Sequence, residues 1–143
     1  MARIKIDLPE KFIFETEITV RISDINYGGH LGNDAVLSIV HEARLRFFNS
    51  LGYTEKNIEG AATIMTDAAI VYRNEGFYGN VLKISLAIQD VSNSGFDVLY
   101  KLVRTSDQKE IAKVKTGVAF FDYELKKIIT IPEVFRTKIL PEK

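Results

Sequence analysis

Hydrophobic and polar residues alternate along the first part of the chain. At every second position from Phe12 to Ile22 stands an apolar residue or a threonine, and the positions between them include Glu15 and Glu17. A repeat of two residues is typical of a strand with one buried face, so this pattern predicts a strand over residues 12–22.

From Asp34 to about Ser50 the hydrophobic spacing becomes helical, with polar residues on the opposite side. The apolar stripe consists of Val36, Val40, Ala43, Phe47 and Leu51, widened by Leu37, Ile39 and Phe48. This pattern predicts one long helix. Asn33 or Asp34 is placed to cap its first turn, and Gly52 stands where a helix commonly ends.

The remainder of the chain has the pattern of strands. Residues 63–73 are rich in β-branched and aromatic side chains, and alternation then predicts three strands whose apolar faces begin at Leu82, Phe96 and Ala112. Short turns join these three strands, so we expect an antiparallel meander. The element order predicts an α+β domain in which an antiparallel sheet wraps around one long central helix. Its open outer face and edges favour a homo-oligomer that pairs edge strands.

Composition restricts the classes of function. A chain of 143 residues with 46% hydrophobic residues forms a single domain, residues 1–143, with a sizeable core. Its 19 basic and 19 acidic residues leave no net charge to attract nucleic acid or an anionic membrane. The absence of cysteine excludes disulfides, a thiolate nucleophile and a zinc site built on sulfur.

The start of the chain does not have the pattern of a signal peptide. Asp7 and Pro9 interrupt it before any apolar run, and no window of the sequence has the length and hydropathy of a membrane span. We therefore expect a cytoplasmic protein that acts on a small molecule.

The candidate chemistry lies in the segment between the first strand and the helix, residues 21–34. Gly28, Gly29 and Gly32 let backbone amides approach a ligand, and the positive end of the helix dipole points to the same place. The segment is therefore a candidate anion or oxyanion site. The alternative is a tight turn in which the glycines only satisfy backbone angles.

Three groups of residues match the pattern of a known family. They are the run Asp24–Asn33, then His41, Glu42, Ala43, Arg44 and Phe48, and the closing Ile131, Pro132 and Glu133. Together with the order of elements they resemble the hotdog-fold acyl-CoA thioesterases of the 4-hydroxybenzoyl-CoA thioesterase type. The resemblance implies a homodimer or homotetramer, with active sites at the subunit interface beside the amino end of the helix. It also implies hydrolysis of acyl-CoA to a free acid and coenzyme A.

One position departs from that family's pattern, because Asn26 stands where the relatives usually carry the catalytic aspartate. An amide is neither a base nor a nucleophile, so Asp24 or Glu42 is expected to supply the carboxylate while Asn26 positions water or donates to the thioester oxygen. His30 is expected to polarise the carbonyl or orient water. The expected substrate-binding residues are Tyr27, Gly28, Gly29, Leu31, Gly32, Asn33 and Arg73. This chemistry needs no metal and no cofactor.

Several of these residues also have structural interpretations. Asp24 fits a turn or a helix-entry cap, Glu42 fits an ion pair with Arg46 one turn later, and His30 fits a contact with the loop backbone. Arg44 lies on the flank of the apolar stripe, where a structural ion pair is favoured over a substrate contact. The alternative functions are a non-catalytic protein that binds acyl-CoA or an acyl carrier, and a hydratase or dehydratase.

Overall fold

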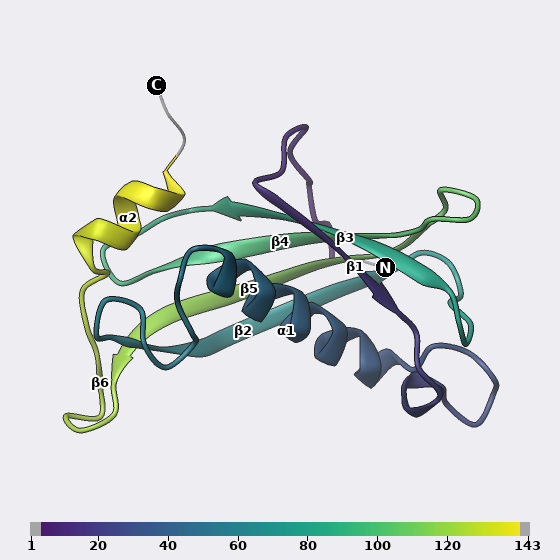
Figure 1. The fold of residues 1–143 in the computed structure, drawn as a ribbon, viewed down its shortest axis with the longest axis horizontal. Helices are drawn as coiled ribbons and strands as arrows, with labels where there is room; N and C mark the ends of the chain where they lie inside the picture. Colours follow the sequence, from purple (N-terminus) through teal and green to yellow (C-terminus); the bar gives the residue numbers. More distant parts are fainter. Residues whose placement is uncertain (1–3, 141–143) are drawn as a thin grey trace.

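The structure is a computed structural model that describes residues 4–140. Its elements are β1 (Phe14–Thr19), the 3-10 helix η1 (Ile22–Asp24), α1 (Asn33–Ser50), β2 (Ala62–Tyr72), β3 (Val81–Gln89), β4 (Gly95–Arg104), β5 (Glu110–Asp122), β6 (Lys127–Ile128) and α2 (Glu133–Ile139). The strands form one antiparallel sheet in the order β1-β3-β4-β5-β2, with β6 paired to β5. The sheet curves around α1 (Figure 1), as the sequence predicted.

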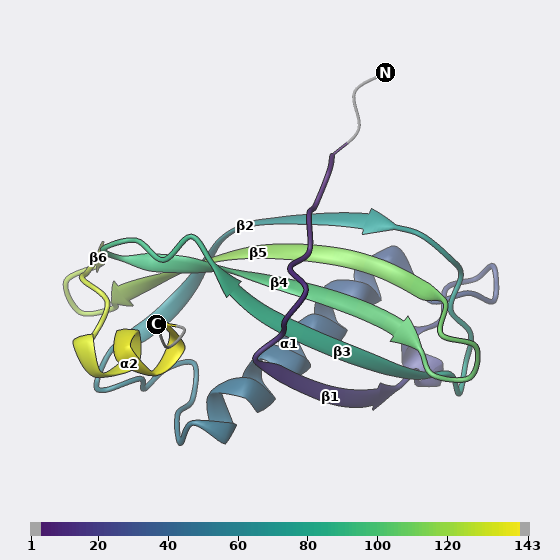
Figure 2. The same ribbon diagram turned by 90° about the horizontal axis from the view of Figure 1, so that it is seen from above.

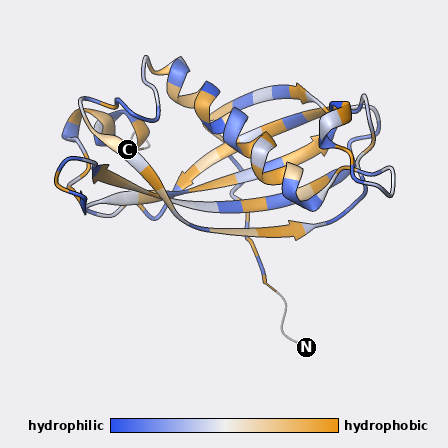
Figure 3. Ribbon diagram, turned by 90° about the horizontal axis from the view of Figure 1, so that it is seen from below, coloured by the Kyte–Doolittle hydropathy of each residue, from blue (hydrophilic) through white to orange (hydrophobic). Residues whose placement is uncertain are grey.

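The core lies between α1 and the inner face of the sheet. Hydrophobic and hydrophilic residues follow one another along the strands (Figure 3), and most hydrophobic residues of β3, β4 and β5 are buried. The fully buried residues of β3, β4 and β5 are Leu82, Ile84, Leu86, Val98, Tyr100, Leu102, Ala112, Val114 and Phe120. At one end of the sheet α2 closes this core, because the ring of Phe135 packs against those of Phe48, Phe96 and Phe120. Burial of apolar surface on this scale is the main source of stability.

The outer face of the sheet is partly covered, which the sequence did not predict. The chain before β1 crosses this face (Figure 2), and Ile6 is only 8% exposed. Ile6, Leu8 and Phe12 form a small apolar cluster with residues of β2, β3 and β4. The expectation that the outer face is left open is therefore wrong over this cluster.

The predicted first strand is shorter than the alternation suggested. β1 ends at Thr19, and the chain then forms η1, whose turn is closed when the Arg21 N–H donates to the Asp24 carboxylate at 2.8 Å. Asp24 and Asn26 therefore do not share one face of a strand, contrary to expectation. The cause is local, because the side chain of Asp24 offers the backbone a competing hydrogen bond.

α1 begins and ends close to the predicted bounds, but its cap differs. Gly32 is the N-cap residue, and neither Asn33 nor Asp34 forms a side-chain cap. A Cβ at Gly32 would lie 2.7 Å from Oδ1 of Asp34, so a larger residue here would require the Asp34 side chain to move. Within residues 4–140, no helix is long and apolar enough to cross a bilayer.

Candidate functional site

A cavity of about 320 Å³ lies at the amino end of α1. This N-terminal pocket is lined by Asn26, His30, Leu31, Asn33, Val36, Tyr72, Arg73, Asn74, Glu75, Gly76 and Ile111. The loop before α1 supplies one wall, and the end of β2 with the segment after it supplies the other. Of the residues predicted from the sequence, Asn26, His30, Leu31, Asn33 and Arg73 are thus brought together.

Asn26 holds the loop before α1 in shape. Its Oδ1 accepts hydrogen bonds from the backbone N–H of Gly28 at 3.0 Å and of His30 at 3.2 Å. Its own backbone N–H donates to the carbonyl of His30, and its carbonyl accepts from the N–H of Gly29. Because the amide oxygen is occupied, the part of the side chain left for a ligand is the Nδ2 donor.

The backbone amides of the loop are engaged within the protein. Beyond the amides bonded to Asn26, the Leu31 N–H donates to the Gly76 carbonyl at 2.7 Å and the Gly32 N–H donates to the Asp24 carbonyl at 2.9 Å. The amides from Gly28 to Gly32, expected to bind an oxyanion, are therefore not free to do so in this conformation. Their hydrogen bonds build the loop instead.

The first turn of α1 offers a different set of donors. The hydrogen bonds found among residues 4–140 include none donated by the backbone N–H of Asn33 or of Asp34. Such N–H groups at the start of a helix point out along its axis and carry its positive partial charge. Since Asn33 lines the pocket, this end of α1 is suited to a negatively charged oxygen.

An imidazole and a carboxylate meet at the wall of this pocket. Nε2 of His30 lies 3.4 Å from Oε2 of Glu75, and the His30 ring packs edge-on against Phe77. Glu75 is the one carboxylate among the residues that line the N-terminal pocket. Nothing in its sequence neighbourhood indicated this role, since Glu75 is 45 positions away from His30. Arg73 also lines this pocket, and its Nε lies 3.6 Å from Oε1 of Glu110.

The two carboxylates predicted from the sequence lie elsewhere. Asp24 is 4% exposed beneath the loop, and its carboxylate is bonded to Arg21. Glu42 pairs with Arg46 at 2.8 Å, and Arg46 also donates to the backbone of β1, so this face of α1 points away from the pocket. The residues that line the cavity do not include Tyr27, Gly28, Gly29 or Gly32 either. In the described part of the chain, no group of three metal-ligating side chains comes together.

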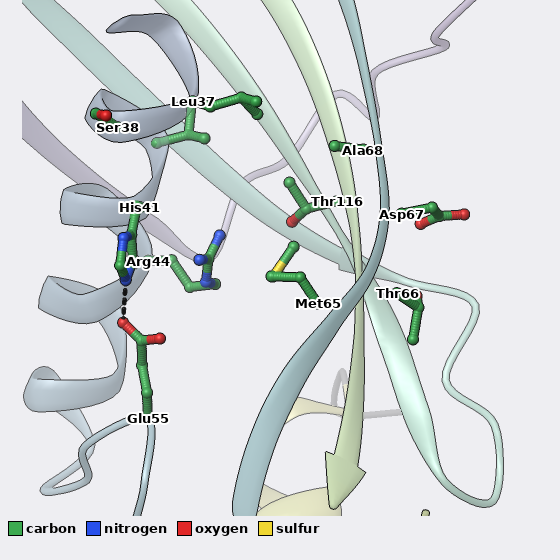
Figure 4. Close-up of a pocket in the computed structure, with 11 residues that line it drawn as sticks. Leu37, Ser38, His41, Arg44, Glu55, Met65, Thr66, Asp67, Ala68 and Thr116 are labelled. Carbon is green, nitrogen blue, oxygen red and sulfur yellow. Dashed lines mark hydrogen bonds and ion pairs between the residues drawn. The ribbon is translucent and has the colours of Figure 1, made fainter. Parts of the chain in front are cut away.

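A second and larger cavity, of about 540 Å³, lies between α1 and β2 (Figure 4). This mid-helix pocket is lined by Leu37, Ser38, Val40, His41, Arg44, Glu55, Met65, Thr66, Asp67, Ala68 and Thr116. Both cavities follow the seam between α1 and β2. Tyr72, which lines the N-terminal pocket, donates from its hydroxyl to the Asn33 carbonyl across this seam.

A buried polar chain forms the floor of the mid-helix pocket. Arg44 is 5% exposed and donates from Nη1 to the Tyr100 hydroxyl at 3.0 Å, which in turn is 2.7 Å from Oγ1 of Thr116. Burial raises the pKa of Tyr100, so its hydroxyl stays neutral at physiological pH. The ion pairs found among residues 4–140 do not include Arg44, so the expectation of a structural ion pair at this residue is wrong. His41, which also lines this pocket, pairs with Glu55 beside the floor.

Comparison with known proteins agrees with this architecture. A sequence model of the thioesterase-like superfamily matches residues 20–139. A search of curated proteins found no match. Among solved structures, the chain is similar to the 1,4-dihydroxy-2-naphthoyl-CoA thioesterase of Synechocystis, with a TM-score of 0.81, 22% identity, and coverage of 88% of this chain and 94% of that one.

Two further structures have the same fold. A hypothetical protein of Aquifex aeolicus has a TM-score of 0.81 at 20% identity, and the match covers 90% of this chain and 100% of that one. A predicted thioesterase of Bacillus stearothermophilus has a TM-score of 0.78 at 21% identity, with coverage of 88% and 92%. The antiparallel sheet and long central helix are therefore those of the hotdog fold.

Proposed function

The chain belongs to the thioesterase-like superfamily, and we propose that it hydrolyses an acyl-CoA to a free acid and coenzyme A in the N-terminal pocket. One observation carries the proposal. Asn33 at the start of α1, the amide side chain of Asn26 and the paired His30 and Glu75 all line a single cavity. Thioester hydrolysis needs both kinds of group, donors for the oxyanion and a base for water.

The donors for the oxyanion are the N–H groups of Asn33 and Asp34 and Nδ2 of Asn26. Negative charge develops on the thioester oxygen when water adds to the carbonyl carbon, and the positive end of α1 stabilises that charge. One well-placed donor lowers such a barrier by about 3 kcal/mol. The carbon–sulfur bond then breaks, and the sulfur of coenzyme A leaves with the electron pair and is protonated to the free thiol.

The base for the attacking water is the pair formed by Glu75 and His30. Water bound beside this pair loses a proton to it as the carbon–oxygen bond forms, and the proton is later passed to the departing sulfur. Asn26 cannot do this because an amide has no basic site. Asp24 is paired with Arg21 and Glu42 with Arg46, so we assign these two carboxylates positioning roles, in the loop and in α1 respectively.

The functional unit is a homodimer that pairs β2 with its copy. β2 is an edge strand of 11 residues, and its Met65 and Tyr72 are 42% and 49% exposed, as Leu37 of α1 is to 41%. The opposite edge, β1, carries Glu15 and Glu17, and charged edge strands disfavour pairing. Pairing through β2 covers the seam that holds both pockets. A cytoplasmic location remains a prediction from the sequence.

The second candidate is a non-catalytic protein that binds acyl-CoA, and the amide at position 26 favours it. Incubation of the protein with short, medium, long and aromatic acyl-CoAs, with free thiol measured over time, separates the two functions. We expect thiol release, and a Glu75→Gln variant should lower kcat about 100-fold, within the range for loss of a general base. Glu124→Gln, on an exposed turn, is the matched control.

Two results would contradict the proposal. If acyl-CoAs bind and stay intact throughout the panel, the protein is a binder. If Glu75→Gln keeps the full kcat while thiol release occurs, the assigned base is wrong, although the hydrolysis itself stands.

A further inference from the structure

The mid-helix pocket contains a buried cation that has no anionic partner. The Arg44 guanidinium carries five N–H donors, and the one protein acceptor found for it among residues 4–140 is the neutral Tyr100 hydroxyl. Every fully buried side-chain nitrogen or oxygen in the described part of the chain has a hydrogen-bond partner. The remaining nitrogens of Arg44 are therefore not sealed in the core but reach the pocket that Arg44 lines.

The carboxylates that line this pocket are already paired. Glu55 is bonded to His41, and Asp67 is bonded to Nζ of Lys115 at 2.9 Å. In Figure 4 the carboxylate of Asp67 points away from Arg44, on the far side of β2. A buried charge that lacks a partner is costly, so an anion that enters this pocket gains a strong interaction with Arg44.

Apolar side chains from both α1 and β2 line this pocket. They are Leu37, Val40, Met65 and Ala68, and they lie beside Ser38 and the paired His41 and Glu55, while Arg44 and Thr116 form the floor. The arrangement fits a ligand with an apolar body and a charged far end. The volume of about 540 Å³ lies within the range of small-molecule sites.

We propose that the mid-helix pocket holds the acyl group and that Arg44 binds a carboxylate at its far end, so that the substrates are CoA thioesters of dicarboxylic acids. This inference rests on the proposed function. Asn33 and Arg44 are 11 positions apart on α1, which is about 16 Å along the axis. The long arginine side chain leans toward the amino end of the helix and shortens this span. The distance favours a medium-length dicarboxylic acyl group.

The test compares two substrates of equal chain length, suberyl-CoA and octanoyl-CoA, which differ by the terminal carboxylate. We expect kcat/KM to be about 100-fold higher for suberyl-CoA, because a bidentate contact between arginine and carboxylate is strong and specific. Arg44→Met should abolish this preference, mainly through a higher KM for suberyl-CoA, whereas Arg46→Met should keep it.

The methionine variant is designed to fold. The Tyr100 hydroxyl keeps its bond to Thr116 when Arg44 is removed, and an apolar side chain of similar size commonly replaces a buried ion without loss of stability. Arg46→Met is the matched control, since Arg46 is on the same helix but bonded to Glu42 and outside the pocket. Thermal melts and the oligomeric state are measured for both variants.

Three outcomes would overturn the inference without touching the proposed function. They are equal kcat/KM for the two substrates, a preference that persists in Arg44→Met, and a change of oligomeric state in Arg44→Met, which would assign the guanidinium to the subunit interface. If no acyl-CoA is hydrolysed, the proposed function fails, and calorimetric titration with suberyl-CoA decides the inference alone. Tighter binding to wild type than to Arg44→Met supports it, and equal or absent binding overturns it.

Discussion

Replacement of Asn26 by aspartate tests the geometry of the N-terminal pocket directly. Oδ1 of Asn26 accepts the N–H groups of Gly28 and His30, and a carboxylate at this position can accept the same two bonds. The loop therefore keeps its shape in Asn26→Asp, while the second carboxylate oxygen takes the place of Nδ2 in the pocket. The change adds a base where the wild-type protein has a hydrogen-bond donor.

The expected gain in activity follows from this placement. A general base in reach of the attacking water contributes about 100-fold to 10,000-fold, and the loss of one oxyanion donor costs about 100-fold, so the net effect should be a rise in kcat of up to about 100-fold. The two N–H bonds stabilise the charged carboxylate and lower its pKa in the folded state relative to the unfolded one. Asn26→Asp is therefore stabilised at neutral pH, and this stabilisation disappears as the pH falls through the folded pKa.

Asn26→Ala measures what the two loop bonds contribute. At about 1 kcal/mol for each hydrogen bond, their removal should cost about 2 kcal/mol. In a domain of this size that corresponds to a drop in Tm of about 6 °C. Thermal melts of the alanine variant and thiol-release kinetics of the aspartate variant against pH are the measurements.

Asn57→Asp is the matched control for both experiments. Oδ1 of Asn57 accepts the N–H of Gly60 at 3.0 Å in an exposed turn that lines neither pocket described above, so activity should not change. The reasoning is refuted if Asn26→Asp folds but gains no activity over wild type, since position 26 would then not face the reacting carbonyl. An unchanged Tm in Asn26→Ala would refute the account of the loop.

Two further predictions concern the sheet and a surface ion pair. A Cβ at Gly95 would lie 2.2 Å from the backbone oxygen of Val118 and 3.1 Å from Cα of Ala119, so Gly95→Ala should lower the free energy of unfolding by about 1–3 kcal/mol in denaturant titrations. An unchanged midpoint would contradict this. Hydrogen bonding to Arg104 lowers the pKa of Asp107 to about 2, so their pair stabilises the fold above the unfolded pKa near 4 and less as the pH falls toward 2. The Tm difference between wild type and Asp107→Asn should be present at pH 6 and vanish near pH 2. A Tm difference that does not depend on pH would contradict the proposed contribution of the ionised Asp107.

The regular elements were predictable because their signals are local. The helical spacing between Val36 and Phe47 and the alternation along β3, β4 and β5 follow directly from which side chains face the core. The hotdog fold inferred from the resemblance is confirmed, as is the family. The predictions for the end of β1 and for the cap of α1 were less accurate. Asp24 and Gly32 act there through short-range hydrogen bonds, which the periodicity of hydrophobic residues does not reveal.

The candidate site was predictable only in part. The loop before α1 was identified because its glycines, amides and histidine are contiguous, but Glu75 reaches it only after β2 has returned along the helix. The sequence around Arg44 does carry a signal. Positions three and four residues away on either side hold no carboxylate, so no ion pair within the helix was available to it. A charged residue on the flank of an apolar stripe, with no local partner, indicates a contact from another element or a ligand.

The segment before β1 also limits how the protein can assemble. Ile6, Leu8 and Phe12 occupy the outer surface of the sheet over β2, β3 and β4. Two dimers that stacked back to back through this surface would have to displace that segment and give up its buried apolar contacts. Sheet-to-sheet stacking over these strands and the docked segment are thus mutually exclusive, and any tetramer that keeps the segment in place must be built through another surface of the molecule.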